Sequence, residues 1–327
     1  MTQRSVLIIG GNGIISSSVS KLALERGFDV TLLNRGQSDT RPPLAGAKHL
    51  TGDAGDATSI SKAVGANDFD VVVNFRSFLP EQVAADVELF TGRTGQYVYI
   101  SSASAYQKPV AHLPITESTP LANPFWQYSR DKIASEDILV AAYREHGFPA
   151  TIVRPSHTYD ETLIPLEGGW TVLDRMRRGL PVVVHGDGTS LWTLTHSRDF
   201  AVGFVGLLDN PVAVGDTFQI TSNFVYPWDA VYRMLGDALG VEPNLVHVAS
   251  ETIAKTLPEW GPGLLGDKSH SVIFDNSKLR AVVPSFLPTT TFAQGAREIV
   301  AWHEAAESRR FVDDKLNAAF DQLIAKA

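Results

Sequence analysis

The chain has 327 residues, is 44% hydrophobic and carries a formal net charge of −8, so its length predicts one large or two fused domains with an ample buried core. The negative charge argues against nucleic acid as the main partner, because phosphate binding needs a basic surface. There is no cysteine, which excludes disulfides, thiolate metal ligands and a cysteine nucleophile.

Strands and helices alternate through the first half of the chain. An apolar run at 6–9 is typical of a parallel strand covered on both faces, and it is too short for a signal or membrane segment. We therefore expect a cytoplasmic protein that does not enter a membrane. The predicted strands lie at 6–9, 29–33, 47–50, 70–74, 96–100 and 150–153, and the predicted helices at 14–26, 58–64, 80–91 and about 128–146. This succession predicts an α/β fold with a doubly wound parallel (Rossmann) sheet.

The second half of the chain is less regular. Pro and Gly interrupt it, a helix is expected at 172–178 and a short strand at 182–184. The stretch 311–326 has apolar residues at helical spacing, which predicts a docked terminal helix, with a homodimer contact as the alternative. We predict a Rossmann domain over 1–160, with a returning segment at about 190–222, and a smaller α/β substrate lobe over 161–327.

A glycine-rich loop joins the first predicted strand to the first helix. Glycine allows the backbone to turn tightly and to approach a pyrophosphate, whose charge is met by N–H groups of the helix N-terminus. Ser16 stands where a third glycine is usual, a position that mainly serves close packing between helix and strand. The residues expected to contact a dinucleotide here are Gly10, Gly11, Asn12, Gly13, Ile14 and Ile15.

Tyr128 and Lys132 are four residues apart and so share one face of a helix. An ammonium this close is expected to favour the phenolate of the tyrosine and to prepare it for proton transfer. Ser102 lies upstream, at the end of the 96–100 strand. Together with the glycine loop, these three residues point to hydride chemistry at a carbinol or carbonyl carbon.

The chain resembles an extended short-chain dehydrogenase/reductase of the NAD-dependent epimerase/dehydratase type. The resemblance covers nearly the whole chain and rests on the motifs named above together with Asp53, the segments 101–106, 154–159 and 186–188, and His196-Ser197-Arg198-Asp199. It is most similar to bacterial and chloroplast members with Asn-Arg-Gly after the second strand, some of which have been linked to RNA.

This resemblance implies a catalytic role for Ser102, Tyr128 and Lys132. Ser102 would donate to the reacting oxygen, Tyr128 would exchange a proton with it, and Lys132 would hold the nicotinamide ribose. Ser101 and Ser104 are expected to satisfy backbone groups at the strand end, and Ser104 is also placed among the substrate contacts.

The predicted cofactor is NADP, with NAD as the alternative. An acid that would bind the ribose of NAD is replaced by Asn34, and Arg35 follows, with Ser38 and Arg41 nearby. A cation here would suit the 2′-phosphate of NADP, although Arg35 could equally be a solvated loop residue. Asp53 resembles the acid that accepts from the adenine amino group, and helix capping is its alternative role.

Further cofactor contacts are expected at Phe75, Arg76, Pro155 and His157. Arg76 stands where the family usually has a small residue, and it could bind a phosphate of the cofactor, bind an anionic substrate, or lie in a surface loop. His157 replaces a common asparagine and could act as a second acid or base, or be an internal hydrogen-bonded histidine. It is also a predicted substrate contact. The histidines show no ligand spacing, so no metal site is expected.

The substrate lobe departs from the pattern of enzymes that bind nucleotide-diphosphate sugars. Such members clamp the diphosphate with arginines, and the corresponding positions here are Trp192, Leu264 and Leu265. We therefore predict an apolar substrate wall including Trp192, although Lys268 or Arg76 could supply a cation. The expected function is hydride transfer on a small sugar-like or polar carbonyl substrate. The alternatives are a nucleotide-sugar epimerase/dehydratase, or a non-catalytic binding protein associated with nucleotide or RNA.

Overall fold

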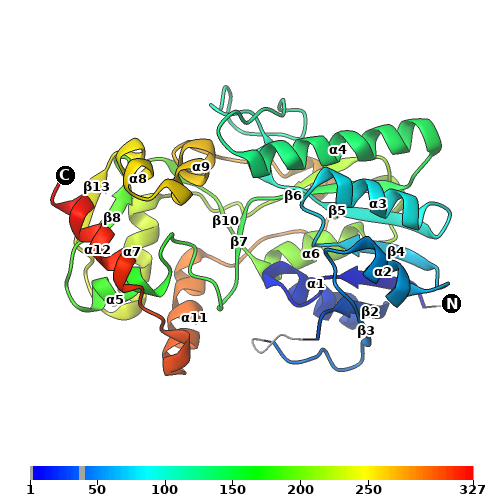
Figure 1. Ribbon diagram of the computed structural model, residues 1–327, viewed down its shortest axis with the longest axis horizontal. Coiled ribbons are helices and arrows are strands. Elements are labelled where there is room, and N and C mark those ends of the chain that lie inside the picture. Colours follow the sequence, from blue (N-terminus) through cyan, green and yellow to red (C-terminus); the bar gives the residue numbers. More distant parts are fainter. Residues whose placement is uncertain (1–2, 37–40, 327) are drawn as a thin grey trace.

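The structure is a computed structural model that describes residues 3–36 and 41–326. A seven-stranded parallel sheet, in the order β11-β6-β5-β4-β1-β2-β3, forms its larger part (Figure 1). Its strands are β1 (Ser5–Ile9), β2 (Asp29–Asn34), β3 (Lys48–Thr51), β4 (Phe69–Asn74), β5 (Thr94–Ile100), β6 (Ala150–Pro155) and β11 (Thr217–Ile220). All six strands predicted for the first half are present, and the predicted doubly wound sheet is confirmed.

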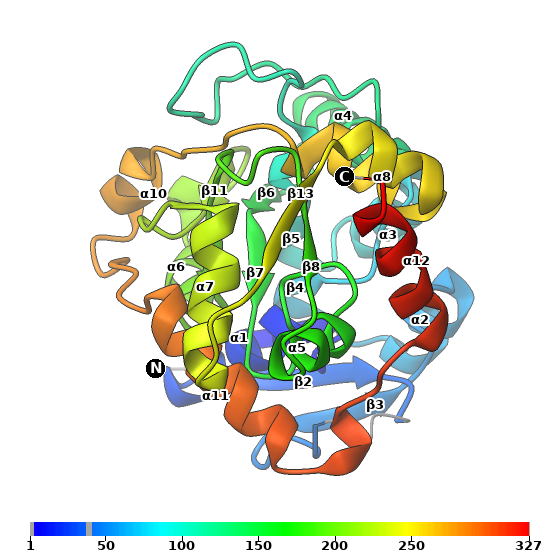
Figure 2. The same cartoon turned by 90° about the vertical axis from the view of Figure 1, so that its left-hand side faces the viewer.

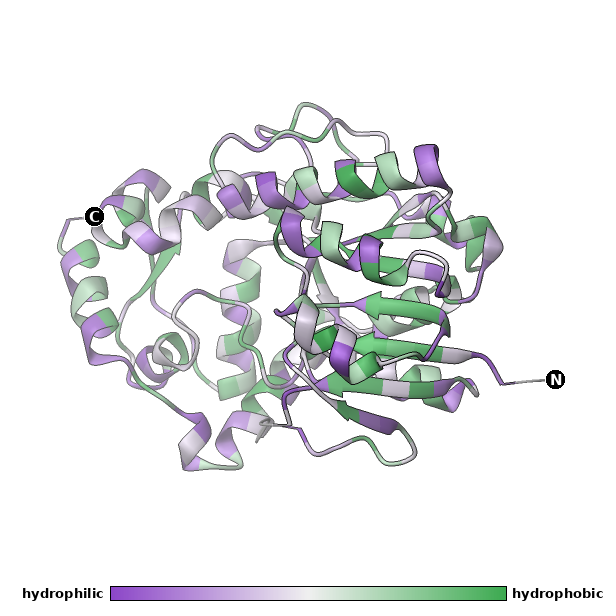
Figure 3. Cartoon of the chain, turned by 45° about the vertical axis from the view of Figure 1, so that its right-hand side comes forward, coloured by the Kyte–Doolittle hydropathy of each residue, from purple (hydrophilic) through white to green (hydrophobic). Residues whose placement is uncertain are grey.

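Helices cover both faces of the sheet. The helices α1 (Ile14–Glu25) and α6 (Ser197–Leu207) lie on one face, and α2 (Ala57–Val64), α3 (Pro80–Phe90) and α4 (Gln127–His146) on the other. Alternate residues of β1 enter the two layers: Val6 and Ile8 pack under α1 and α6, and Leu7 and Ile9 under α2, α3 and α4. This alternation explains why β1 is apolar throughout. In Figure 3 the inner strands are correspondingly hydrophobic.

The order of the strands brings the loops after β1 and β4 next to each other. β1 pairs in parallel with β2 on one side and with β4 on the other. The order in which the chain adds strands to the sheet therefore reverses between β1 and β4. The glycine loop follows β1, and Phe75 and Arg76 follow β4. Ligands of open α/β sheets bind at such a reversal, beyond the carboxyl ends of the strands.

A smaller lobe packs beside these carboxyl ends (Figures 1 and 2). Its core contains Trp170, Leu173, Trp228, Ile299 and Phe320. The elements of the second half, apart from α6 and β11, are β7 (His157–Tyr159), α5 (Trp170–Arg177), β8 (Val182–His185), β9 (Leu191–Trp192), β10 (Leu194–His196), β12 (Tyr226–Pro227), α7 (Trp228–Leu239), β13 (Leu245–Val248), α8 (Ser250–Thr256), α9 (Gly261–Gly263), a π-helix at Leu264–Lys268, α10 (Ser277–Val282), α11 (Phe292–Glu304) and α12 (Asp314–Ile324). Short 3₁₀ turns lie at Ala103–Ala105, Pro211–Ala213, Pro258–Trp260 and Glu307–Arg309.

The predicted terminal helix begins later than expected. Asp313 caps α12 by accepting from the backbone N–H groups of Lys315 and Leu316, so Phe311 lies before the helix and is 76% exposed. Phe320 and Leu323 are buried against the lobe, as a docked helix requires. The alternative of a homodimer contact stays a prediction.

Segments of the second half return to the sheet. β11 pairs with β6, and α6 packs on α1. The division into a domain at 1–160 with a returning segment and a lobe over 161–327 stays a prediction. No helix of the described residues is long and apolar enough to cross a membrane.

Candidate active site

The glycine loop turns sharply at Gly10, whose φ is +82°. The Ser16 hydroxyl donates to the carbonyl oxygen of Gly10 (2.7 Å) and accepts from the backbone N–H of Gly13 (2.7 Å). The serine in the place of a third glycine therefore closes the loop by hydrogen bonding. Gly11 is buried, and a Cβ there would lie 2.8 Å from Leu32 Cδ2. Its role is close packing against β2.

Two adjoining hollows lie beyond the carboxyl ends of the strands. The larger has a volume of about 480 Å³ and is lined by the predicted residues Gly10, Gly13, Ile14, Ile15, Phe75, Arg76, Ser102, Ser104, Tyr128, Lys132, Pro155, His157 and Trp192. The second, of about 370 Å³, is lined by Asn12, Asn34, Arg35 and Asp53, and shares Gly10, Gly13 and Arg76 with the first. Every residue predicted for catalysis or cofactor binding except Gly11 therefore lines one of these two adjoining hollows, which together form a groove.

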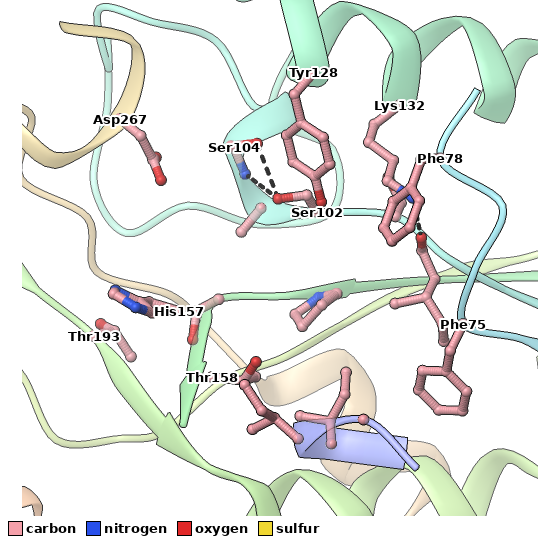
Figure 4. Close-up of a pocket in the computed structure, with 18 of the residues that line it drawn as sticks. Phe75, Phe78, Ser102, Ser104, Tyr128, Lys132, His157, Thr158, Thr193 and Asp267 are labelled. Atoms are coloured by element: carbon pink, nitrogen blue, oxygen red, sulfur yellow. Dashed lines mark hydrogen bonds between the residues drawn. The ribbon is translucent and has the colours of Figure 1, made fainter. Parts of the chain in front are cut away.

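The end of β5 presents a chain of hydroxyl groups. The Ser129 hydroxyl donates to Ser104 Oγ (2.8 Å), which lies 2.9 Å from Ser102 Oγ. Ser102 Oγ also accepts from the backbone N–H of Ser104 (3.1 Å) and faces Tyr128 (Figure 4). With Ser104 donating, Ser102 accepts twice and its own O–H can point into the cavity. Ser101 instead bonds to Glu136 (2.5 Å), which is paired with the buried Arg154.

Tyr128 and Lys132 both face the cavity from α4, but their electrostatics differ from the expectation. Burial raises the pKa of the Tyr128 phenol above its usual value; the Ser102 hydroxyl lowers this pKa and the Asp267 charge raises it further. Burial also lowers the pKa of Lys132 to about 7. The expectation that the ammonium favours the phenolate is therefore wrong for the protein without ligand, because removal from water penalises both charged forms.

The Lys132 ammonium is held in place by backbone carbonyl groups. Its Nζ donates to the carbonyl oxygens of Ser77 (3.0 Å), in the loop after β4, and of Ile100 (2.7 Å), at the end of β5. The Phe78 ring lies 5.0 Å from Nζ, at the cavity edge. These contacts fix the lysine beside the place where a ribose would lie.

His157 is an internal, hydrogen-bonded histidine. Trp192 Nε1 donates to His157 Nδ1 (3.1 Å), which leaves the ring proton on Nε2. Burial, followed by the Lys268 charge, lowers the pKa of His157 to about 3, so the ring is neutral. A role as a second acid or base near neutral pH does not fit this environment.

Arg76 lies directly over the glycine loop. A Cβ on Gly10 would come within 2.5 Å of Arg76 Cγ, and the guanidinium carbon lies 5.0 Å from the Phe78 ring centre. The side chain is exposed and lines both hollows where they meet. It is therefore a residue that could bind the diphosphate of a dinucleotide lying across both hollows.

The adenosine end of the groove differs in part from the prediction. Arg35 is exposed there, but Arg41 is bound to Asp160 and to Thr162 Oγ1 (2.8 Å). Arg41 also donates to the carbonyl oxygen of Asn12 (3.2 Å) and therefore joins the glycine loop to the segment that follows β7. Ser38 falls outside the described residues. The alternative role of Asp53 as a helix cap is wrong, since Asp56 caps α2 by accepting from Thr58 N–H (2.9 Å). Asp53 Oδ1 instead accepts from Gly55 N–H (2.9 Å) in a local turn.

Sequence reasoning missed how the π-helix meets the site. Asn123 Nδ2 donates to the carbonyl oxygens of Ser104 (2.9 Å) and Gly266 (2.8 Å), which ties that helix to the end of β5. Asp267 and Lys268 consequently line the cavity. Leu264 and Leu265 are not among the lining residues, so the predicted apolar wall is wrong apart from Trp192. The π-helix at Leu264–Lys268 instead turns Asp267 and Lys268 toward the cavity, and no periodic sequence pattern indicates a π-helix.

The groove fits a dinucleotide. A sharp glycine turn, the N-terminus of α1 and an exposed arginine meet at its middle, and two hollows extend from this point. Asn34, Arg35 and Asp53 would hold the adenosine half, and Lys132 and Pro155 the nicotinamide half. No group of three or more His, Asp or Glu among residues 3–36 and 41–326 is arranged to hold a metal ion.

A family model for the NAD dependent epimerase/dehydratase family matches residues 6–221. The chain belongs to this family. Among its relatives, the chain is 27% identical to 2′-dehydrokanamycin reductase of Streptomyces kanamyceticus, over 86% of the chain and 79% of the relative. It is also 27% identical to the chloroplast stem-loop binding protein of 41 kDa b of Arabidopsis thaliana, over 75% of the chain and 66% of the relative. The match thus spans slightly less than two thirds of the chloroplast protein.

The fold is shared with solved structures of the family. dTDP-glucose 4,6-dehydratase from Bacillus anthracis, solved in complex with NAD, superposes with a TM-score of 0.74. It is 20% identical, and the match covers 93% of this chain and 98% of that one. At this identity the likeness concerns the fold alone.

Proposed function

We propose that this family member is a cytoplasmic NAD(P)-dependent oxidoreductase or epimerase-like enzyme, with Ser102, Tyr128 and Lys132 as its catalytic residues. The proposed substrate is a small sugar-like or polar carbonyl compound, and the preferred cofactor is NADP. The observation that carries the proposal is the meeting of these three side chains in one cavity that continues to the glycine loop.

Each residue has a definite task in this proposal. A bound nicotinamide supplies or accepts the hydride. The raised pKa of Tyr128 keeps its phenol protonated at neutral pH, so it can give a proton to the oxygen of a carbonyl group as that carbon is reduced. Ser102 donates a hydrogen bond to the same oxygen and stabilises its developing charge. Lys132 holds the ribose. The protonated phenol is the form that reduction of a carbonyl group requires.

The test compares two tyrosines of the same helix. Tyr128→Phe should lower turnover about 10²- to 10⁴-fold, the usual contribution of a positioned acid, with little change in cofactor affinity. Tyr143 is 41% exposed on α4 and lines neither hollow, so Tyr143→Phe should keep wild-type turnover. Cofactor oxidation with a panel of sugars and ketones measures turnover, and calorimetry measures affinity. Wild-type turnover in Tyr128→Phe would refute the catalytic assignment.

Two other functions have some support. Relatives named UDP-glucose 4-epimerase and dTDP-glucose 4,6-dehydratase favour a nucleotide-sugar substrate. The name of the chloroplast relative favours binding of an RNA stem-loop. The net charge of −8 weighs against RNA, and a gel-shift assay with a stem-loop RNA would decide that point.

A further inference from the structure

Asp267 is a carboxylate that the fold holds at the substrate end of the cavity. It comes from the π-helix of the second lobe, opposite Ser104 and Tyr128 (Figure 4). Asn123 anchors this helix through Gly266, and a Cβ on Gly266 would meet Asn123, Phe125 and Trp126 at 3.1 Å. The carboxylate is therefore built into a tightly packed junction.

Only one of the two carboxylate oxygens is used within the described part of the protein. Oδ1 accepts from Lys108 Nζ (3.0 Å), and the Lys108 side chain is fully buried and does not line the cavity. The Asp267 side chain itself is 17% exposed. Oδ2 has no hydrogen-bond partner among residues 3–36 and 41–326. The lysine thus supports the carboxylate from behind, and Oδ2 remains an acceptor for a ligand.

The neighbouring polar groups of this end are engaged elsewhere. Lys268 lines the cavity, but its ammonium is held 3.0 Å from Glu167. The Thr193 hydroxyl donates to the Val272 carbonyl oxygen (3.2 Å). His157 retains its Nε2–H as a donor. The substrate end therefore offers an acceptor on Asp267 and a donor on His157.

We propose that Asp267 is a specificity-determining residue that binds a hydroxyl or ammonium group of a sugar-like substrate and disfavours anionic substrates. The inference rests on the proposed function, because it assumes that the substrate occupies this cavity. An aspartate oxygen accepts a hydrogen bond from such a donor, whereas a carboxylate or phosphate of the ligand would meet a like charge. Tyr128 and Ser102 would bind the reacting oxygen at the other side of the same ring.

The experiment uses three probes with one ring: D-glucosamine, D-glucose and D-glucuronate. Their affinities for the NADP-saturated protein are measured by ligand-observed NMR titration. The wild-type protein should bind glucosamine and glucose more tightly than glucuronate. Asp267→Asn still accepts from Lys108 through its amide oxygen but turns an N–H donor toward the cavity. It should lower the preference for glucosamine over glucuronate about tenfold to a hundredfold, the range for a charge-assisted hydrogen bond.

Asp321→Asn is the matched control. Asp321 also forms an ion pair, with Arg175, but it is 70% exposed and lines neither hollow, so the preference should not change. A wild-type preference for glucuronate, no binding of any probe, or an unchanged preference in a folded Asp267→Asn variant would each overturn the proposal. The wild-type preference among the three probes tests the proposal even if the Asp267→Asn variant does not fold. Cofactor affinity, measured on the same samples, separates the two proposals: its absence refutes the proposed function rather than the role of Asp267.

Discussion

The contact between Gly10 and Arg76 can be tested by adding a single methyl group. Gly10 has a φ of +82°, so Gly10→Ala costs roughly 1–2 kcal/mol in backbone strain alone. The new Cβ would also lie 2.5 Å from Arg76 Cγ and must displace that side chain from the loop. Gly27 has nearly the same φ, +87°, and nothing within 4 Å of its Cβ position, so Gly27→Ala carries the strain without the collision.

Both variants should melt about 1.5–3 °C below the wild type, because roughly 1–2 kcal/mol of strain is set against the unfolding entropy of a chain of 327 residues. Only Gly10→Ala should also lose NADP affinity. If Arg76 binds the diphosphate, the loss should be about tenfold to a hundredfold, and Arg76→Ala should show a similar loss. Differential scanning fluorimetry and calorimetry measure the two quantities.

The double variant decides whether the arginine mediates the effect. With Arg76→Ala already present, adding Gly10→Ala should cost stability through strain but remove no further affinity, because the displaced side chain is gone. A further loss of affinity in the double variant would show that the methyl group itself obstructs the cofactor. Equal affinities in Gly10→Ala and Gly27→Ala would refute the reasoning altogether.

Three other outcomes are expected. Arg35→Ala should reduce a preference for NADP over NAD by about tenfold to a hundredfold in calorimetric titrations, and Arg26→Ala, at an exposed arginine, is the control. Tighter binding of NAD than of NADP, unchanged in Arg35→Ala, would reject the preference. The pKa of Lys132 is about 7, and an anionic cofactor favours its charged form, so the affinity for NADP should fall as pH rises from 6 to 9, with proton uptake on binding. Lys132→Met should abolish this pH dependence, and a wild-type affinity that does not change with pH would contradict the prediction. Trp192, which stands where sugar-nucleotide members carry a diphosphate-clamping arginine, lines the cavity, so uridine and thymidine diphosphates should not bind at millimolar levels. A raised melting temperature with either nucleotide would restore a sugar-nucleotide substrate.

The residues that local sequence patterns could identify are those next to strand ends. Five of the six predicted strands are largely buried, and they are recognisable because a parallel strand covered on both faces must be apolar; β3, at the edge of the sheet, is largely exposed. The same logic places Ser102 and the glycine loop at one edge of the sheet. Ser16 shows a limit of motif matching. A serine in place of the third glycine weakens the match to the motif, yet its hydroxyl holds the loop closed by bonding to Gly10 and Gly13.

The parts that sequence could not predict depend on contacts between distant segments. Asn123 joins β5 to the π-helix over a separation of 143 residues, and no periodic pattern encodes such a pairing. The pKa of Tyr128 was misjudged for a related reason. Spacing gives the distance between Tyr128 and Lys132, but the dominant effect on both pKa values is burial, which depends on how distant segments pack around the cavity.

The charges along the groove explain how one acidic protein could bind an anionic cofactor and still discriminate among substrates. A net charge of −8 repels a dinucleotide at long range, but at physiological salt this repulsion is screened beyond about 8 Å. Binding is therefore governed by the groups that line the groove, where Arg35 and Arg76 mark the cofactor end. Asp267 marks the opposite end, and the protonated Tyr128 lies between them. Two exposed arginines thus favour an anion at the cofactor end, and the proposed role of Asp267 favours a neutral or cationic ligand at the other end, where Lys108 and Lys268 are both already paired with carboxylates.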